Sequence, residues 1–139
     1  MSKSRSHAVL GTTLAFVLTL AAGSALAWLA GLLDPQTDGP DYAALEAAAR
    51  LVPPSAQGPV WLPHLLESGS PYNDRNSRGA LLGLRLGDSA GNLYRAMLEA
   101  LAFHLKFNLD EMQPLAGPGI FPLTLNGGIT RNRLLSEIK

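Results

Sequence analysis

The sequence predicts an α/β fold, and three observations support that class. Nearly half of the residues, 47%, are hydrophobic, so the chain can bury a core. One segment, residues 88–112, has helical composition and is apolar over most of its surface, which is typical of a helix buried between other layers. Around it, glycine- and proline-bounded segments follow in the order strand, loop, helix, strand, glycine turn, helix, which is an α/β pattern.

The chain begins with a polar, basic tail, residues 1–7, followed by residues 8–33, which contain no charged side chain. This stretch is long enough to span a bilayer. It also has the layout of a secretory signal, with Lys3 and Arg5 before an apolar region and a small-x-small cleavage pattern at 25–27.

A buried strand, a turn and a core helix explain the same uncharged stretch equally well. Gly11, Thr12 and Thr13 interrupt it with turn-like residues, and Gly23 and Ser24 interrupt it again. In this interpretation Ser24 is the N-cap of a helix that begins at Ala25. Composition alone leaves both interpretations open.

The next elements are a short helix and two strands. Residues 34–41 form a loop, and a helix is expected over 42–51, with Glu46 and Arg50 in the favourable i,i+4 order. Strands are expected over 59–66 and 79–86, the first at a sheet edge or ending at Pro63 because proline cannot donate to the ladder.

The long helix is expected to start at an Asp88 or Ser89 cap and to end near Met112. Arg95 and Glu99 on it are expected to form a structural or solvated pair. A turn at 117–119, a strand over 120–125, a tight turn at 126–128 and a helix starting at Thr130 or Arg131 complete the chain. That last helix is predicted to be cut short at residue 139.

The charge balance and the residue types exclude several functions. Eleven Lys and Arg match eleven Asp and Glu, so no basic excess favours nucleic acid or an anionic membrane. The chain has no Cys, which excludes disulfides and thiolate metal sites. His64 and His104 have no third ligand at a suitable spacing, so no metal site is expected.

The segment Gly79–Glu99 (GALLGLRLGDSAGNLYRAMLE) resembles the signature of the FGGY carbohydrate kinases. The small, glycine, aliphatic, polar and acidic positions of that signature are all filled at the right spacing. Three further stretches match the family's C-terminal domain: the strand at 60–63 with Ser70-Pro71 after it, the strand and glycine turn at 123–128, and the Gly11–Thr13 turn.

This resemblance implies a partial actin-like ATPase (ribonuclease H-like) domain, the C-terminal half of a sugar kinase. Kinases of this family bind sugar and ATP between two domains, with Mg²⁺ on the phosphates. The resemblance places ATP contacts at six residues: Gly11, Thr12, Thr13, Gly127, Gly128 and Asn132. It assigns no catalytic residue and no metal ligand to this chain, because the catalytic base belongs to the family's first domain.

The resemblance also implies that residues 8–139 are an incomplete domain. The family carries several tens of residues between the segments matched near 14–23, so an internal deletion is predicted there. An arginine that the family places before Ser70-Pro71 is missing, and the domain is predicted to be truncated at 139.

The expected ligands are ATP with Mg and a pentulose, hexulose or polyol, in the cytoplasm and without nucleic acid or membrane. A homodimer or a missing N-terminal kinase half is the expected protein partner. Two alternatives stay open. One is a non-catalytic kinase remnant or interaction module, and the other is a small exported protein with a signal peptide over residues 1–27.

Overall fold

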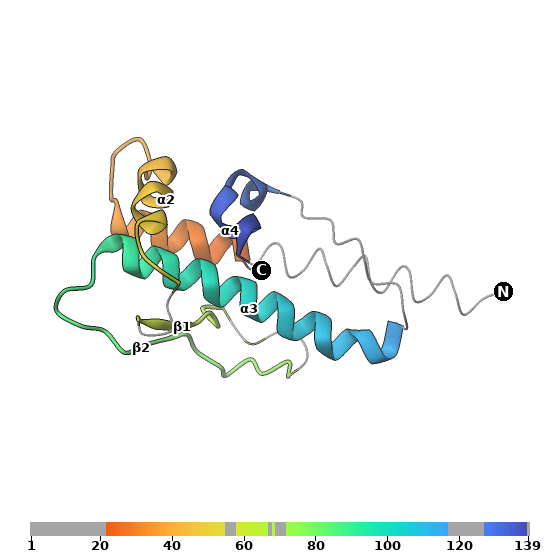
Figure 1. Cartoon of the computed structure of the whole chain (residues 1–139). Helices are drawn as coiled ribbons and strands as arrows, with labels where there is room; N and C mark the ends of the chain where they lie inside the picture. Colours follow the sequence, from red (N-terminus) through yellow and green to blue (C-terminus); the bar gives the residue numbers. More distant parts are fainter. Residues whose placement is uncertain (1–21, 55–57, 67, 69–71, 117–126, 139) are drawn as a thin grey trace.

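A single long helix, α3 (Ala90–Ala116), runs through the middle of the structure (Figure 1). This computed structural model describes residues 22–54, 58–66, 68, 72–116 and 127–138. In Figure 1, α2 and α4 lie on one side of α3, and a β hairpin lies on the other. As predicted, Ser89 caps α3: its Oγ accepts from the Asn92 N–H at 3.4 Å. The helix continues past Met112, however, through Pro114.

The uncharged N-terminal stretch contributes a core helix over residues 22–33, drawn in orange in Figure 1. Four of its side chains are buried, and all four are apolar: Ala25, Leu26, Leu29 and Ala30. The expectation that Ser24 caps a helix beginning at Ala25 is wrong, because residues 22–24 are already helical. In the part of the chain that the structure describes, no helix has the length and apolarity needed to cross a membrane.

Helix α2 (Tyr42–Arg50) forms nearly where the sequence predicts it. The Asp41 carboxylate caps it by accepting from the Ala44 N–H at 3.0 Å. Leu45 and Ala49, four residues apart, share the buried face. The predicted pair between Glu46 and Arg50 is confirmed at 2.9 Å.

The two expected strands form an antiparallel hairpin, but each is only three residues long. Strand β1 is Val60–Leu62 and β2 is Ala80–Leu82, with Trp61 opposite Leu81. The strand β1 ends where Pro63 follows, since proline has no N–H to donate. Strand β2 ends at Gly83, whose φ of 76° is a left-handed conformation that leaves the strand.

The hairpin is held to α3 by its central tryptophan. The indole N–H of Trp61 donates to the Leu93 carbonyl at 3.2 Å, and its ring meets that of Trp28 edge-on at 6.3 Å. Because side chains alternate along a strand, Val60, Leu62 and Leu82 point the other way, and all three are exposed.

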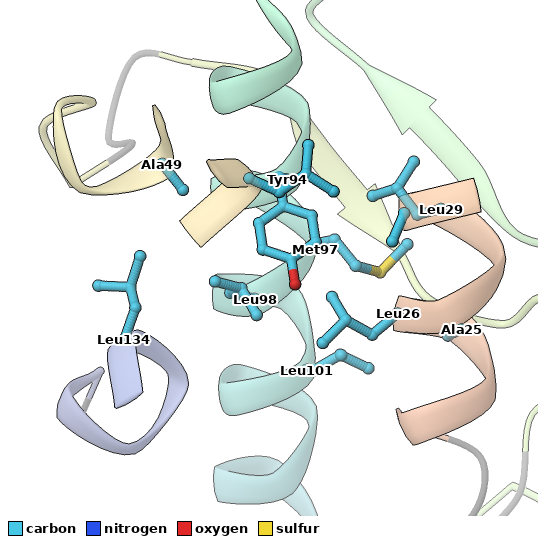
Figure 2. Close-up of a cluster of buried hydrophobic side chains, with 11 residues drawn as sticks. Ala25, Leu26, Leu29, Ala49, Tyr94, Met97, Leu98, Leu101 and Leu134 are labelled. Carbon is cyan, nitrogen blue, oxygen red and sulfur yellow. The ribbon is translucent and has the colours of Figure 1, made fainter. Parts of the chain in front are cut away.

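The core lies where the helix over 22–33, α2 and α4 meet α3 (Figure 2). Helices α2 and α3 approach each other closely at Gly91, where an added Cβ would lie 2.8 Å from the Ala48 carbonyl oxygen. The buried cluster consists of Ala25, Leu26, Leu29, Ala30, Leu45, Ala49, Tyr94, Met97, Leu98, Leu101 and Leu134.

The C-terminal part differs from the single helix that the sequence predicts from Thr130 or Arg131. A 3₁₀ turn, η1 (Gly128–Arg131), comes first, and the helix α4 (Arg133–Glu137) follows it. The Asn132 side chain separates the two by capping α4. The strand predicted over 120–125 lies outside the described residues.

Candidate functional site

The glycine turn, Gly127–Gly128, is the part of the predicted ATP site that the structure describes. Gly127 has φ 90° and ψ −173°, a conformation that a side chain would strain. Its carbonyl accepts from both the N–H and the hydroxyl of Thr130, at 3.1 and 2.7 Å. These bonds fix the turn at the start of η1.

The second glycine of the turn is open to its surroundings. Among the described residues, no heavy atom lies within 4 Å of the position that a Cβ on Gly128 would occupy, and both glycines are exposed. Packing against the described part of the chain therefore does not require glycine at 128. An open backbone without a side chain is the arrangement that lets a ligand approach closely.

Asn132, the third predicted contact in this region, faces inward. It is buried, and its Oδ1 accepts from the Leu135 N–H at 2.9 Å. Its Nδ2 donates to the Tyr94 hydroxyl at 3.2 Å. Both ends of the amide thus have partners within the protein. Burial raises the pKa of Tyr94 to about 12, so this hydroxyl stays protonated at physiological pH.

Helix α4 is also bonded to α2. Glu46 Oε1 accepts from the Leu134 N–H at 3.2 Å and from Arg50 Nη2 at 2.9 Å. Arg50 in turn donates to both carboxylate oxygens of Glu137, at 2.7 and 3.0 Å, a bidentate pair. These bonds lower the pKa of Glu137 below its usual range.

The remaining predicted ATP contacts, Gly11, Thr12 and Thr13, lie outside the described residues. The structure therefore brings together Gly127, Gly128 and Asn132 only. The two arginines beside Asn132, Arg131 and Arg133, are both exposed near the turn.

Other ionisable residues of the fold contact one another away from the turn. Arg95 and Glu99 form the predicted pair at 2.7 Å, and it is structural rather than solvated, because the two side chains are only 11% and 9% exposed. The imidazoles of His64 and His104 meet edge-on at 5.6 Å, and His64 also bonds Ser77 at 2.6 Å. Among the described residues no three His, Asp or Glu side chains gather as a metal site would require.

Two residues that organise this region, Tyr94 and Glu46, make long-range contacts that the sequence does not predict. Tyr94 lies within the buried stretch of α3, and a buried tyrosine normally finds a partner for its hydroxyl. That rule predicts a hydrogen bond but not its partner, which is 38 residues away. Glu46 was identified only as the partner of Arg50, and its bond to Leu134 spans 88 residues.

Comparison with known proteins identifies the family to which this region is similar. Residues 5–139 match the C-terminal domain of the FGGY family of carbohydrate kinases. The chain is 37% identical over 94 residues to a glycerol kinase of Gloeobacter violaceus, covering 68% of this chain and 19% of that protein. It is 36% identical over 120 residues to a glycerol kinase of Thermus brockianus, covering 85% and 23%.

Comparison with solved structures shows the same similarity to carbohydrate kinases. A xylulose kinase from Rhodospirillum rubrum superposes with a TM-score of 0.68 and 36% identity, covering 84% of this chain and 23% of that one. The predicted fold class, a partial actin-like ATPase domain, is confirmed. The chain spans about a fifth to a quarter of the length of these relatives, 19–23%.

Proposed function

This chain belongs to the FGGY family of carbohydrate kinases, and we propose that it supplies the nucleotide-binding half of an ATP-dependent sugar kinase. The observation that carries the proposal is the exposed glycine turn, in which Gly127 is needed for its backbone conformation, whereas an added Cβ on Gly128 would meet no described atom within 4 Å. Backbone without a side chain admits the flat adenosine or a phosphate at close range. Phosphoryl transfer depends mainly on positioning and charge neutralisation, so a rigid nucleotide cradle is a substantial part of the catalyst.

In this proposal Gly127 and Gly128 meet the nucleotide through their main chain. Gly11, Thr12 and Thr13 belong to the same site as expectations, with backbone N–H groups and hydroxyls suited to phosphate oxygens. The free space beside Gly128 among the described residues supports a nucleotide at this turn. Mg²⁺ neutralises phosphate charge when bound, and it is commonly held through phosphates and waters with few protein ligands. This is compatible with the lack of an acidic cluster among the described side chains.

The acceptor is a small polyhydroxy compound. The relatives named glycerol kinase and xylulose kinase support a polyol or a pentulose, and a hexulose remains within the proposal. The residue that removes the proton from the acceptor hydroxyl belongs to a second, sugar-binding half. We expect that half to be supplied by additional kinase sequence or by another chain, homodimerisation included, in the ATP-containing cytoplasm.

The proposal predicts that the full chain melts at a higher temperature with Mg-ATP. A ligand present at 100 times its Kd stabilises the folded state by about 2.7 kcal/mol. Gly128→Ala should fold normally, because its Cβ would meet no described atom within 4 Å. It should lose most of this shift, because in this proposal the methyl group faces the nucleotide. Thermal melts with and without Mg-ATP measure both effects.

The matched control is Gly87→Ala, another exposed turn glycine whose added Cβ would meet no atom of the described residues within 4 Å. It should retain the full ATP-dependent shift. If the wild-type melt is indifferent to Mg-ATP, the nucleotide proposal is wrong and the non-catalytic remnant becomes the better description. If Gly128→Ala shifts as the wild type does, the nucleotide does not contact this turn.

A further inference from the structure

The glycine turn is joined to the core through the helix that follows it. We call five side chains the α4 clamp, because they hold α4 to its neighbours: Glu46, Arg50, Tyr94, Asn132 and Glu137. Tyr94 comes from α3, Glu46 and Arg50 come from α2, and the other two residues belong to the α4 segment. Leu134 adds an apolar anchor in the core beside Ala49 and Leu98 (Figure 2).

The most buried bond of the clamp joins Tyr94 to Asn132. Tyr94 is fully buried and Asn132 is 8% exposed, so the 3.2 Å bond between them is shielded from water. A buried polar group that loses its partner pays a desolvation cost. The orientation of the Asn132 side chain is therefore set by the core.

The main chain transmits that orientation to the turn. The Asn132 N–H donates to the Ile129 carbonyl at 3.1 Å, and the Thr130 N–H donates to the Gly127 carbonyl at 3.1 Å. These two backbone hydrogen bonds overlap along the chain, and together they link Asn132 to the glycine turn. A shift of Asn132 cannot occur without a change in η1.

The two clamp residues of α2, Glu46 and Arg50, are charged and hold α4 through hydrogen bonds. Glu46 Oε1 accepts from Nε and Nη2 of Arg50 and from the Leu134 N–H. Arg50 thereby holds the Glu46 carboxylate in place, and it also donates two hydrogen bonds to the Glu137 carboxylate. Both ends of α4 are therefore tied to α2, while its N-cap is tied to α3.

We propose that Tyr94, acting through Asn132, is a positioning residue for the glycine turn, and that Asn132 serves this link instead of contacting the nucleotide. The nucleotide part of this inference rests on the proposed function; the coupling between clamp and turn does not. A turn held in one conformation before binding loses less conformational freedom when the ligand arrives, which favours affinity.

The test is Tyr94→Phe, which removes one hydroxyl from a side chain too buried to touch a ligand. Amide hydrogen exchange of the full chain, read by NMR, should be faster for Thr130 and Asn132 by about three- to tenfold, as expected for one lost hydrogen bond. The amide of Leu45 at the start of α2 should be unchanged. Tyr72→Phe, at an exposed tyrosine, is the matched control and should change none of them.

The pattern of exchange separates positioning from a purely structural role. If only the Leu134 and Leu135 amides exchange faster, the clamp holds α4 but not the turn, and the proposal is overturned. Asn132→Ser provides a second route if Tyr94→Phe does not fold. Serine retains a good N-cap but is too short to reach Tyr94, so it should reproduce the faster exchange at Thr130.

Nucleotide binding then decides the role of the link. If the wild type binds Mg-ATP, Tyr94→Phe should raise the Kd for Mg-ATP by about three- to tenfold. This is the change in affinity that corresponds to the loss of one hydrogen bond, here between Tyr94 and Asn132. An unchanged Kd overturns the positioning role. If the wild type binds no nucleotide, the proposed function fails, and the exchange result alone upholds or overturns the coupling between clamp and turn.

Discussion

Gly91 determines how closely α2 and α3 approach each other. Replacing it with alanine would place a Cβ 2.8 Å from the Ala48 carbonyl oxygen and 2.9 Å from its carbon, both backbone atoms that cannot rotate away. Alanine usually stabilises a helix relative to glycine by about 1 kcal/mol. Here the clash should reverse that sign, and Gly91→Ala should destabilise the protein by about 1–3 kcal/mol.

Urea denaturation measures the effect, and Gly31 provides the control. Gly31 lies in the helix over residues 22–33, and its added Cβ would meet none of the described atoms within 4 Å. Gly31→Ala should therefore raise the urea midpoint while Gly91→Ala lowers it. Two helical glycines that responded alike would mean that the contact with Ala48 does not set the helix spacing.

Single residues also show where sequence reasoning succeeds. Gly127 was expected in a tight turn, and its φ of 90° requires a residue without a side chain. Asn132 was expected at the nucleotide because the resemblance to the FGGY kinases places it there, and in the structure its amide caps α4 and bonds Tyr94. Sequence position alone does not tell whether an amide faces a ligand or the interior, since either partner satisfies it.

At the scale of elements, local sequence patterns predict the presence of a helix or strand better than they predict its length. Helix α2 was predicted to within one residue, because its composition is helical and the Glu46–Arg50 spacing marks it; the Asp41 cap at its start is seen only in the structure. The strands were predicted at eight residues and form only three. Their ends depend on the conformation of Gly83 and on the partner strand, neither of which an apolar run of residues specifies.

The contact between the hairpin segment and α3 should make stability depend on pH. Burial lowers the pKa of His104 below 6.5, and the nearby His64 lowers it further. The folded state then binds fewer protons than the unfolded state, so the free energy of unfolding decreases as pH falls through 6.5 and on through the lowered pKa. Urea midpoints between about pH 7.5 and 5.5, near the ordinary histidine range, should show this loss.

The variant His104→Gln should flatten the dependence, since it removes the titrating group. His64→Gln should flatten it less, because it removes only the secondary cause and its own bond to Ser77. The lowered carboxylate pKa values of Asp34 and Glu137 act in more acidic solution and do not compete in this window. An unaltered slope in His104→Gln would assign the pH dependence to other groups.

At the scale of the whole molecule, the buried side chains of the described residues form one cluster, and the hairpin lies at its edge. The buried cluster draws on the helix over residues 22–33, α2, α3 and α4, whereas the hairpin contributes mainly through Trp61 and has an exposed outer face. A two-stranded hairpin is marginally stable by itself in water. Its persistence therefore depends on docking to α3 and not on its own three pairs.

The two tryptophans of the chain, Trp28 and Trp61, meet at this docking surface, and their rings lie 6.3 Å apart. Near-UV circular dichroism should therefore report hairpin docking, while the far-UV signal reports the helices. For the wild type the two thermal transitions should coincide, as expected when one cooperative unit unfolds. Trp61→Phe loses the bond to the Leu93 carbonyl, so its hairpin should detach at a lower temperature than its helices melt.

In Trp61→Phe, the temperature at which the hairpin detaches is measured by proteolysis of the hairpin segment during heating. Near-UV circular dichroism does not serve here, because this variant lacks the tryptophan pair. Trp28→Phe is the matched control, because it also removes the ring pair but retains the Trp61 hydrogen bond, and its hairpin should stay protected until the helices melt. If wild-type near-UV and far-UV transitions fail to coincide, the hairpin is independent of the helical core. In that case the conformation of the glycine turn would depend on α2, α3 and α4, which the α4 clamp joins, and not on the hairpin.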